Sequence, residues 1–162
     1  MRRISFADSE CPVARGADTV GDVWSLLILR DLFDGLTRFD ELQTDLGIAP
    51  NMLTRRLGTL GAAGLVERRR YSERPPRDEY VLTARGRDFH PVVLALYAAE
   101  RIAPERRTMV LTDRATGAEV DPVLVDRRTG RPIDELDVRF LPGPAAGPRL
   151  RGRLTALAGR AG

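Results

Sequence analysis

Gly47 and Pro50, three residues apart, constrain the fold of this chain more than any other local feature. Three apolar residues before them fall on one face of a helix: Phe39, Leu42 and Leu46. Gly47 can end that helix and turn the chain, and Pro50 is favoured at the first position of a following helix. The spacing therefore predicts two helices joined by a turn of a few residues, a helix-turn-helix.

Capping residues predict where the neighbouring helices begin. Asp22 is the expected N-cap of an almost wholly apolar helix that starts at Val23 and ends at Gly35. Such a helix belongs at the centre of the core. Thr37 is the expected N-cap of the first helix of the pair, with the Asp40 carboxylate reaching back to the free amide.

The second helix of the pair, 50–60, has an apolar stripe and a contrasting polar face. The stripe is formed by residues that point inward: Leu53, Leu57 and Leu60. The opposite side carries small and polar residues: Asn51, Thr54, Arg55, Gly58 and Ala62. Small residues beside Arg55 would let the helix enter the major groove of DNA, and an ordinary polar surface is the alternative. Arg56 projects toward the edge of the stripe, where it is expected to touch a phosphate or an acidic neighbour.

Two strands are predicted after Gly64, at residues 65–71 and 78–83. The diproline at 75–76 cannot donate to a β-ladder and is expected in the connecting loop, 72–77. A hairpin directly after a helix-turn-helix is the order of a winged helix. The expected fold class is therefore mainly α with a β-hairpin wing (α+β).

The predicted wing is rich in arginine. Because strand side chains alternate, Arg68 and Arg70 share one face and Arg69 lies on the other, so that only part of this run is expected to grip DNA. Arg74 and Arg77 flank the diproline at the tip.

All 26 basic residues are arginine, so their placement is more informative than their number. Residues 50–90 hold nine arginines against five acids, whereas residues 1–49 hold five against nine. The second helix and the hairpin therefore lie in a basic segment, which is the local field that a polyanionic partner would feel.

Thr83 is the expected cap of a further helix that reaches about Ala103, kinked or restarted by Pro91 near His90. Its broad apolar face has little left to pack on within a compact winged domain, so a homodimer contact is predicted. The interface candidates are Phe89, Val93, Leu96 and Tyr97.

Several motifs between Cys11 and about Ala103 resemble the HxlR-type bacterial transcriptional regulators, a branch related to the MarR group. In order, they are CPVAR, WSLLILR, RFDEL, LTRRL, GLVERR, PPRDEY and LTARG. The resemblance implies a homodimeric winged helix that binds pseudo-palindromic operator DNA, with repression expected. It implies DNA contacts from the recognition helix and the wing tip: Asn51, Thr54, Arg55, Arg56, Arg74 and Arg77. Strand alternation adds Arg68 and Arg70.

Cys11, the only cysteine, precedes Pro12 and is the expected N-cap of a short helix. Several regulators of the family that this chain resembles sense electrophiles or oxidants through an N-terminal cysteine. A helix N-terminus lowers a thiol pKa, although the adjacent Glu10 acts in the opposite direction. A redox sensor and a small residue with no sensing role are the two alternatives. An unknown small-molecule effector is a further expected input.

The C-terminal third contains a short repeat, at residues 113–121 and 126–134. It predicts two hairpin turns in a small sheet. The spacing resembles a zinc-ribbon-like module of some family members, but Thr116, Asp126 and Thr129 stand where thiolates would be expected. A metal-free β mini-domain is therefore predicted.

The expected organisation is a DNA-binding and dimerisation domain at 1–104, a small β module at 105–141, a linker at 142–148 and a basic tail or short helix at 149–162. That last segment is expected to dock on the partner subunit or to trail along DNA.

No catalytic residues are predicted, because the sole histidine, His90, has no nucleophile and orienting acid beside it. No cofactor, metal or membrane span is expected. The first residues lack the apolar stretch of a secretory signal, so a cytoplasmic location is predicted. The alternative function is a winged-helix protein–protein interaction module in which the basic face is incidental.

Overall fold

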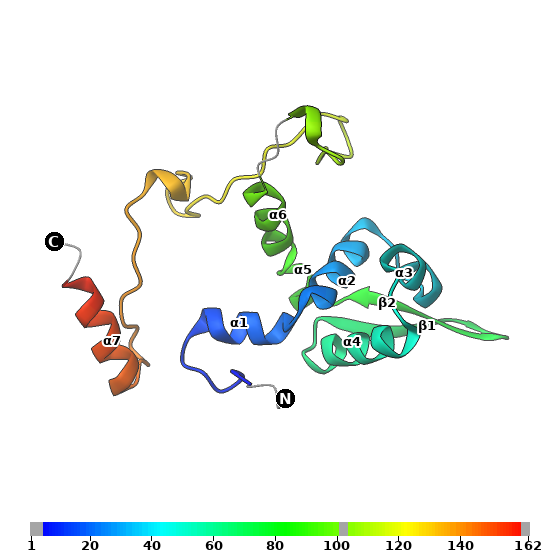
Figure 1. Cartoon of the computed structure of the whole chain (residues 1–162), viewed down its shortest axis with the longest axis horizontal. Helices are drawn as coiled ribbons and strands as arrows, with labels where there is room; N and C mark the ends of the chain where they lie inside the picture. The colour runs from blue at the N-terminus through cyan, green and yellow to red at the C-terminus, as the bar shows by residue number, and fades with distance from the viewer. Residues whose placement is uncertain (1–4, 101–103, 160–162) are drawn as a thin grey trace.

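The structure is a computed structural model that describes residues 5–100 and 104–159. The predicted end of the last core helix near Ala103 lies outside these residues, as do positions 1–4 and 160–162 of the predicted terminal segments. Figure 1 shows a helical body from which a β-hairpin projects, and a long C-terminal segment that leaves this body.

The order of elements is that of a winged helix-turn-helix, so the predicted fold class is confirmed. In chain order, the elements are α1 (Pro12–Val20), α2 (Val23–Asp34), α3 (Phe39–Leu46), α4 (Pro50–Ala62), β1 (Val66–Glu73), β2 (Pro76–Leu82), α5 (Ala84–Arg87), α6 (His90–Ala99), two 3-10 turns (Pro104–Arg106 and Ile133–Glu135) and α7 (Pro148–Ala158).

Helix α2 lies at the centre of the core, as its composition predicts. Ile28 and Leu29 are completely buried, and α2 contacts α1, α3, α4, β2 and α6. The predicted N-cap is confirmed, because the Asp22 carboxylate accepts hydrogen bonds from the backbone N–H groups of Trp24 (3.0 Å) and Ser25 (3.3 Å). The inward stripe of α4 is buried as expected.

The predicted cap of α3 is wrong by one residue. The N-cap is Arg38, and the carboxylate of Glu41, not Asp40, accepts from the backbone N–H of Arg38 at 3.0 Å. Thr37 belongs instead to a short strand-like pairing with β2, since its carbonyl accepts from the N–H of Tyr80 at 2.7 Å. This pairing holds Thr37 extended and moves the start of the helix to Phe39.

The wing is longer than predicted because Ser72, Glu73, Pro76 and Arg77 belong to the strands and not to the loop. Glu73 pairs with Pro76, and the turn consists of Arg74 and Pro75, joined by a cis peptide bond. A proline is tolerated here because the first residue of a strand need not donate to the ladder. The register shifts at Tyr71, which has no partner on β2.

The predicted restart of the last core helix is confirmed. Thr83 caps the short helix α5, accepting from the N–H of Gly86 at 3.0 Å, and α6 begins at His90 with Pro91 in its first turn. Gly86 is needed where α5 approaches Leu65, the residue just before β1, because an added Cβ would lie 2.0 Å from the Leu65 carbonyl oxygen. The ring of His90 packs on Phe33 of α2, with centroids 4.3 Å apart.

The C-terminal turns form as predicted, but the small sheet does not. Each turn is closed by one isolated bridge, Thr112 with Glu119 and Val125 with Pro132, and the one sheet within the described residues is β1–β2. The apolar residues that flank each turn are largely exposed, so no second layer holds the turns together. The final helix, α7, starts at Pro148, one residue earlier than the predicted linker boundary allows.

Candidate nucleic-acid interface

The exposed face of α4 is unobstructed and carries the predicted recognition residues. Asn51, Thr54 and Arg55 are all exposed. A Cβ added at Gly58 would meet no atom within 4 Å. The Thr54 hydroxyl donates to the Pro50 carbonyl (2.9 Å), and the Asn51 side-chain oxygen accepts from the N–H of Met52 (2.7 Å), which leaves the Asn51 amide NH₂ free to donate. The Arg55 guanidinium has no ion pair within the described part of the chain.

Arg56 contacts an acidic neighbour, which is the second of the two roles expected for it. Its Nη1 lies 2.9 Å from Oδ2 of Asp22, and both side chains are mostly buried, at 15% and 19% exposure. The pair ties α4 to the residue that caps α2, at the junction of the two helices. Arg56 therefore lies off the exposed face with its charge paired, and its contact with DNA stays a prediction.

Arg68 and Arg70 share one face of the wing, as predicted, but both are paired with Asp78 on β2. Nε of Arg70 donates to Oδ1 of Asp78 at 2.8 Å, and Arg68 pairs with the other oxygen. The hydrogen bonds, from Arg70 first and Arg68 second, hold the pKa of Asp78 below its ordinary value. Arg69 is likewise paired, with Glu79 at 2.7 Å. The basic run is thus largely neutralised by acids across the hairpin, although the Arg68 and Arg70 side chains remain 64% and 44% exposed. Their contact with DNA stays a prediction.

The wing tip keeps its charge. Arg74 lies in the turn, Arg77 follows Pro76 at the start of β2, and both side chains are exposed. Neither has an ion-pair partner in residues 5–100 or 104–159. The tip projects beyond the helical body (Figure 1).

Sequence reasoning missed Arg38 at the base of the wing. Its guanidinium carbon lies 5.2 Å from the centroid of the Tyr71 ring, so that the N-terminus of α3 and the wing are joined by a cation–π contact. Arg77 lines the same shallow recess, of about 380 Å³. No local signal could have found this contact, because it depends on the bulge that presents Tyr71.

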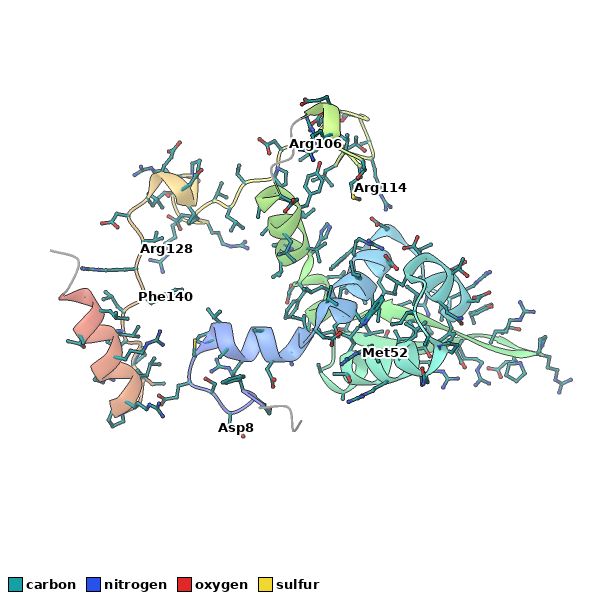
Figure 2. All side chains as sticks on the ribbon, viewed as in Figure 1. Asp8, Met52, Arg106, Arg114, Arg128 and Phe140 are labelled. Carbon is teal, nitrogen blue, oxygen red and sulfur yellow. The ribbon has the colours of Figure 1, made fainter. Side chains whose placement is uncertain are left out.

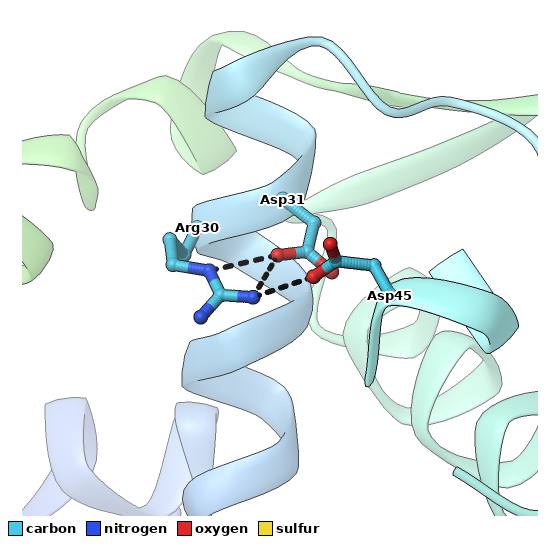
Figure 3. A network of polar contacts seen from close by, with 3 residues as sticks. All are labelled: Arg30, Asp31 and Asp45. Atoms are coloured by element: carbon cyan, nitrogen blue, oxygen red, sulfur yellow. Dashed lines mark hydrogen bonds and ion pairs between the residues drawn. The ribbon is translucent and has the colours of Figure 1, made fainter. Parts of the chain in front are cut away.

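An ion-pair network positions α3 against α2 (Figure 3). Arg30 donates to Oδ1 of Asp31 through Nε (2.8 Å) and to Oδ2 of Asp45, on α3, through Nη2 (2.8 Å). Asp31 is 1% exposed, and Oδ2 has no hydrogen-bond partner among the described groups. Burial raises the pKa of Asp31, against the opposing effect of Arg30.

Cys11 is the N-cap of α1, as predicted, and is partly exposed. The nearby backbone N–H of Ala14 lowers the pKa of the Cys11 thiol, burial opposes this, and Arg153 and Arg15 lower it further. The Glu10 carboxylate, expected to oppose thiolate formation, accepts from the N–H of Gly147 at 2.9 Å, just before α7.

The four residues predicted for a dimer interface differ in their exposure. Leu96 is 53% exposed on α6, whereas Phe89 packs against the core. Val93 and Tyr97 are half-buried, and the Tyr97 hydroxyl accepts from the backbone N–H of Leu111 at 3.1 Å. A cleft of about 1010 Å³ lies between α2, α6 and residues 107–121.

The described residues offer neither a cluster for a metal ion nor a membrane-spanning helix. They contain no group of three or more His, Cys, Asp or Glu side chains that could hold a metal ion. No helix among them is both long and apolar enough to cross a membrane.

Known proteins match this geometry and its sequence. The model of the HxlR-like helix-turn-helix family matches residues 19–108. Rv3095 of Mycobacterium tuberculosis (strain ATCC 25618 / H37Rv), an uncharacterized HTH-type transcriptional regulator, is 38% identical over 135 residues, covering 82% of this chain and 85% of its own.

Solved structures agree. PA1607, described as a transcription factor, has a TM-score of 0.75 and 35% identity over 86% of this chain and 100% of its own. The redox regulator HypR in its oxidized form has a TM-score of 0.52 and 35% identity over 57% of this chain and 100% of its own. Together with the exposed face of α4 beside a charged wing, these matches show that the chain belongs to the HxlR-like helix-turn-helix family of transcriptional regulators.

Proposed function

We propose that the protein is a homodimeric repressor that binds a pseudo-palindromic operator. In each subunit, α4 enters the major groove and the wing tip contacts the backbone of the flanking DNA. Arg55 reads a base edge, with Asn51 and Thr54 beside it, while Arg74 and Arg77 contact phosphates. The protein acts by occupying DNA and not by catalysis.

One observation carries this proposal: the arginines of the winged domain divide into paired and free groups. Arg56, Arg68, Arg69 and Arg70 are held by acids of the same domain. Arg55, Arg74 and Arg77 have no such partner within the part of the chain that the structure describes. These three free arginines lie on the predicted recognition helix and the wing tip, which are the two elements that a winged helix presents to a duplex. Arg15 on α1 and Arg85 and Arg87 on α5 also have no ion pair among the described residues, but they lie outside those two elements.

Two-fold symmetry follows from the apolar surface of α6. Val92 and Leu96 are 43% and 53% exposed, although the helix has a strongly apolar composition. A second copy packed on α6 would cover them and would relate two recognition helices by a two-fold axis. Two half-sites about one helical turn apart, roughly 34–36 Å, would then be read together.

Salt dependence tests DNA binding against the rival function, a protein–protein interaction module. The purified protein is titrated onto the duplex upstream of its own gene between about 50 and 200 mM salt, with fluorescence anisotropy as the readout. Displacement of phosphate counterions should make the affinity fall steeply, with a slope of about −0.9 per neutralised phosphate. Absent binding, or binding that does not change with salt, would favour the rival.

For the input, we propose that oxidation of Cys11 alters operator binding. The N-cap position and the lowered thiol pKa support a reactive thiolate. HypR, to which the winged domain is similar, is itself described as a redox regulator. The cleft beside α6 favours a second candidate, a small-molecule effector.

Cys11→Ser separates the two inputs. A disulfide reagent such as oxidised glutathione should change operator affinity for the wild type and leave the Cys11→Ser protein unchanged. Equal responses of the two proteins would remove Cys11 as the sensor and leave the cleft as the candidate input site.

A further inference from the structure

The segment 108–141, called the arm here, exposes more apolar surface than an isolated chain can keep in water. Six of its large residues are each at least 58% exposed: Met109, Val123, Leu124, Val138, Phe140 and Leu141. Phe140 reaches 78% and lies on the extended stretch that leads to α7 (Figure 2). So many exposed large apolar side chains on one segment make the arm a candidate for contact with another molecule.

Both ends of the arm are fixed to its own chain. Near the start, the backbone N–H of Leu111 donates to the Tyr97 hydroxyl on α6 at 3.1 Å. Just beyond the end, the N–H of Gly147 donates to the Glu10 carboxylate at 2.9 Å. Between these points the chain spans from α6 to the region of α1 and α7 without regular structure apart from two turns (Figure 1). An arm held at both ends cannot simply fold its apolar side chains back into the core of the winged domain.

We propose that the arm packs against a second copy of this chain, so that each subunit of the dimer is in contact with the arm of the other. The proposal rests on the homodimer proposed above and names the surface that completes it. Two-fold symmetry makes the exchange reciprocal, since an isologous interface buries the same residues on both copies.

The size of a stable interface is the first reason for choosing a second copy. Helix α6 has ten residues, which is about 15 Å of helix at 1.5 Å per residue. One face of so short a helix provides a small fraction of the roughly 800 Å² per partner that a standard interface buries. The arm is joined to α6 by the hydrogen bond between Leu111 and Tyr97 and supplies further apolar surface, so α6 and the arm form one extended interface.

The charge of the arm argues against DNA as its partner. Residues 108–141 contain five arginines and seven acids, so the arm carries a small net negative charge. A polyanion would gain little electrostatic attraction there, in contrast to the free arginines of α4 and the wing.

The arm also extends beyond the winged domain that the wider family shares. Residues 1–104 are 104 of 162 residues, or about 64% of the chain, whereas PA1607 matches 86% of it and Rv3095 matches 82%. These matches therefore include part of the arm, while HypR matches 57%. Part of the arm is therefore present in some relatives, as expected if they share a way of assembling.

Photo-cross-linking of isotope-labelled subunits tests the exchange directly. p-Benzoylphenylalanine replaces Phe140 in the full-length protein, and light and nitrogen-15-labelled copies are mixed until native mass spectrometry shows mixed dimers. Cross-linked peptides that join one light and one heavy chain are expected. Cross-links found only within one isotope, while the dimer mass is retained, would overturn the inference and leave the homodimer standing. A monomeric mass would overturn both.

Substitution of two apolar residues of the arm gives an independent measure of its contribution to dimerisation. Val138→Asp with Phe140→Asp should weaken dimerisation by about tenfold or more, measured by analytical ultracentrifugation, because buried apolar anchors dominate interface energies. Ala145→Asp adds negative charge in the exposed linker without removing an apolar anchor, and it should leave dimerisation unchanged. An unchanged dissociation constant for the double variant, with its native circular dichroism spectrum retained, would contradict the proposal.

Discussion

At the scale of single residues, loss of Arg55 is expected to change which DNA sequence is preferred. Loss of the wing arginines is expected to weaken binding to every sequence. Arg55→Ala should relax discrimination at one base pair by about 1–3 kcal/mol, because a bidentate contact to a guanine edge is lost. Arg74→Ala with Arg77→Ala should weaken binding to all sequences alike and lower the salt slope by about one per arginine lost. Binding to a library of operator variants at two salt concentrations measures both effects.

The paired arginine Arg69 is the matched control for these substitutions. Arg69→Ala removes one arginine of the wing, but its charge is already compensated by Glu79. Its effect on the salt slope should therefore be much smaller than that of Arg74→Ala. Equal slopes for the two variants would show that the division into paired and free arginines does not decide DNA affinity.

Asp31 predicts a second residue-scale effect, on the pH dependence of stability. Burial raises its pKa in the folded protein above the usual value of 3.8. Between these two pKa values the folded state binds more protons than the unfolded state, so the free energy of unfolding falls as pH rises through that window. Asp31→Asn removes this loss, and its stability relative to wild type should therefore increase from about pH 4 upward.

Urea denaturation at a series of pH values measures this difference. Asp45→Asn is the control, because Asp45 is bound to the same Arg30 but is 46% exposed. If the two variants show the same pH dependence, the change in stability is caused by the loss of a charge from the ion-pair network and not by the burial of Asp31.

Sequence reasoning succeeded at this scale where a role depends on one helix and failed where it depends on a neighbour. The buried stripe of α4 and the caps at Asp22 and Cys11 follow from local spacing, and all were predicted. The partners of Arg68 and Arg70 were missed, because cross-strand pairing with Asp78 requires the register of the hairpin. That register depends on a bulge at Tyr71, which the sequence of the turn does not predict.

At the scale of elements, the packing of α5 against Leu65, just before β1, depends on the absence of a side chain at Gly86. A Cβ there would lie 2.0 Å from the Leu65 carbonyl oxygen, which belongs to the backbone and cannot move without displacing the strand. Gly86→Ala should therefore lower the free energy of unfolding by about 2–4 kcal/mol, in the range of severe steric changes. Thermal and urea unfolding measure the loss.

Gly16→Ala is the matched control for this prediction. Gly16 lies within α1, and an added Cβ meets no atom within 4 Å. Because alanine is the better helix former, this variant should gain up to about 1 kcal/mol of stability. A loss at both positions would mean that methyl addition disturbs this fold in general, and the close approach at Gly86 would not be the cause.

Element boundaries show the same limit of prediction as single residues. The break between α5 and α6 was predicted from Pro91, since proline acts on its own helix. The start of α3 was placed one residue early, because Thr37 is drawn into a bridge with β2 that lies far away in sequence. The C-terminal turns were predicted from their Thr-Gly sequences, but the absence of a sheet between them depends on tertiary packing, which the repeat does not encode.

At the scale of the whole molecule, dimerisation and operator affinity are expected to be coupled. Leu96 is exposed on α6 and is remote from the free arginines of α4 and the wing. Leu96→Asp should disrupt the proposed contact and leave the fold of the winged domain unchanged. The variant would then present one recognition helix at a time, and it would lose the gain in affinity that comes from linking two half-sites.

A comparison of two duplexes measures this coupling. Wild-type protein should bind a full operator at least about 100-fold more tightly than a single half-site, in the range that bivalent linkage provides. Leu96→Asp should bind both duplexes with nearly the same low affinity, and Ala145→Asp, in the exposed linker, should behave as wild type. If Leu96→Asp keeps the wild-type preference for the full operator, α6 is not the helix that joins the two subunits. The two-fold axis would then have to pass through another surface, with the arm the next to be tested.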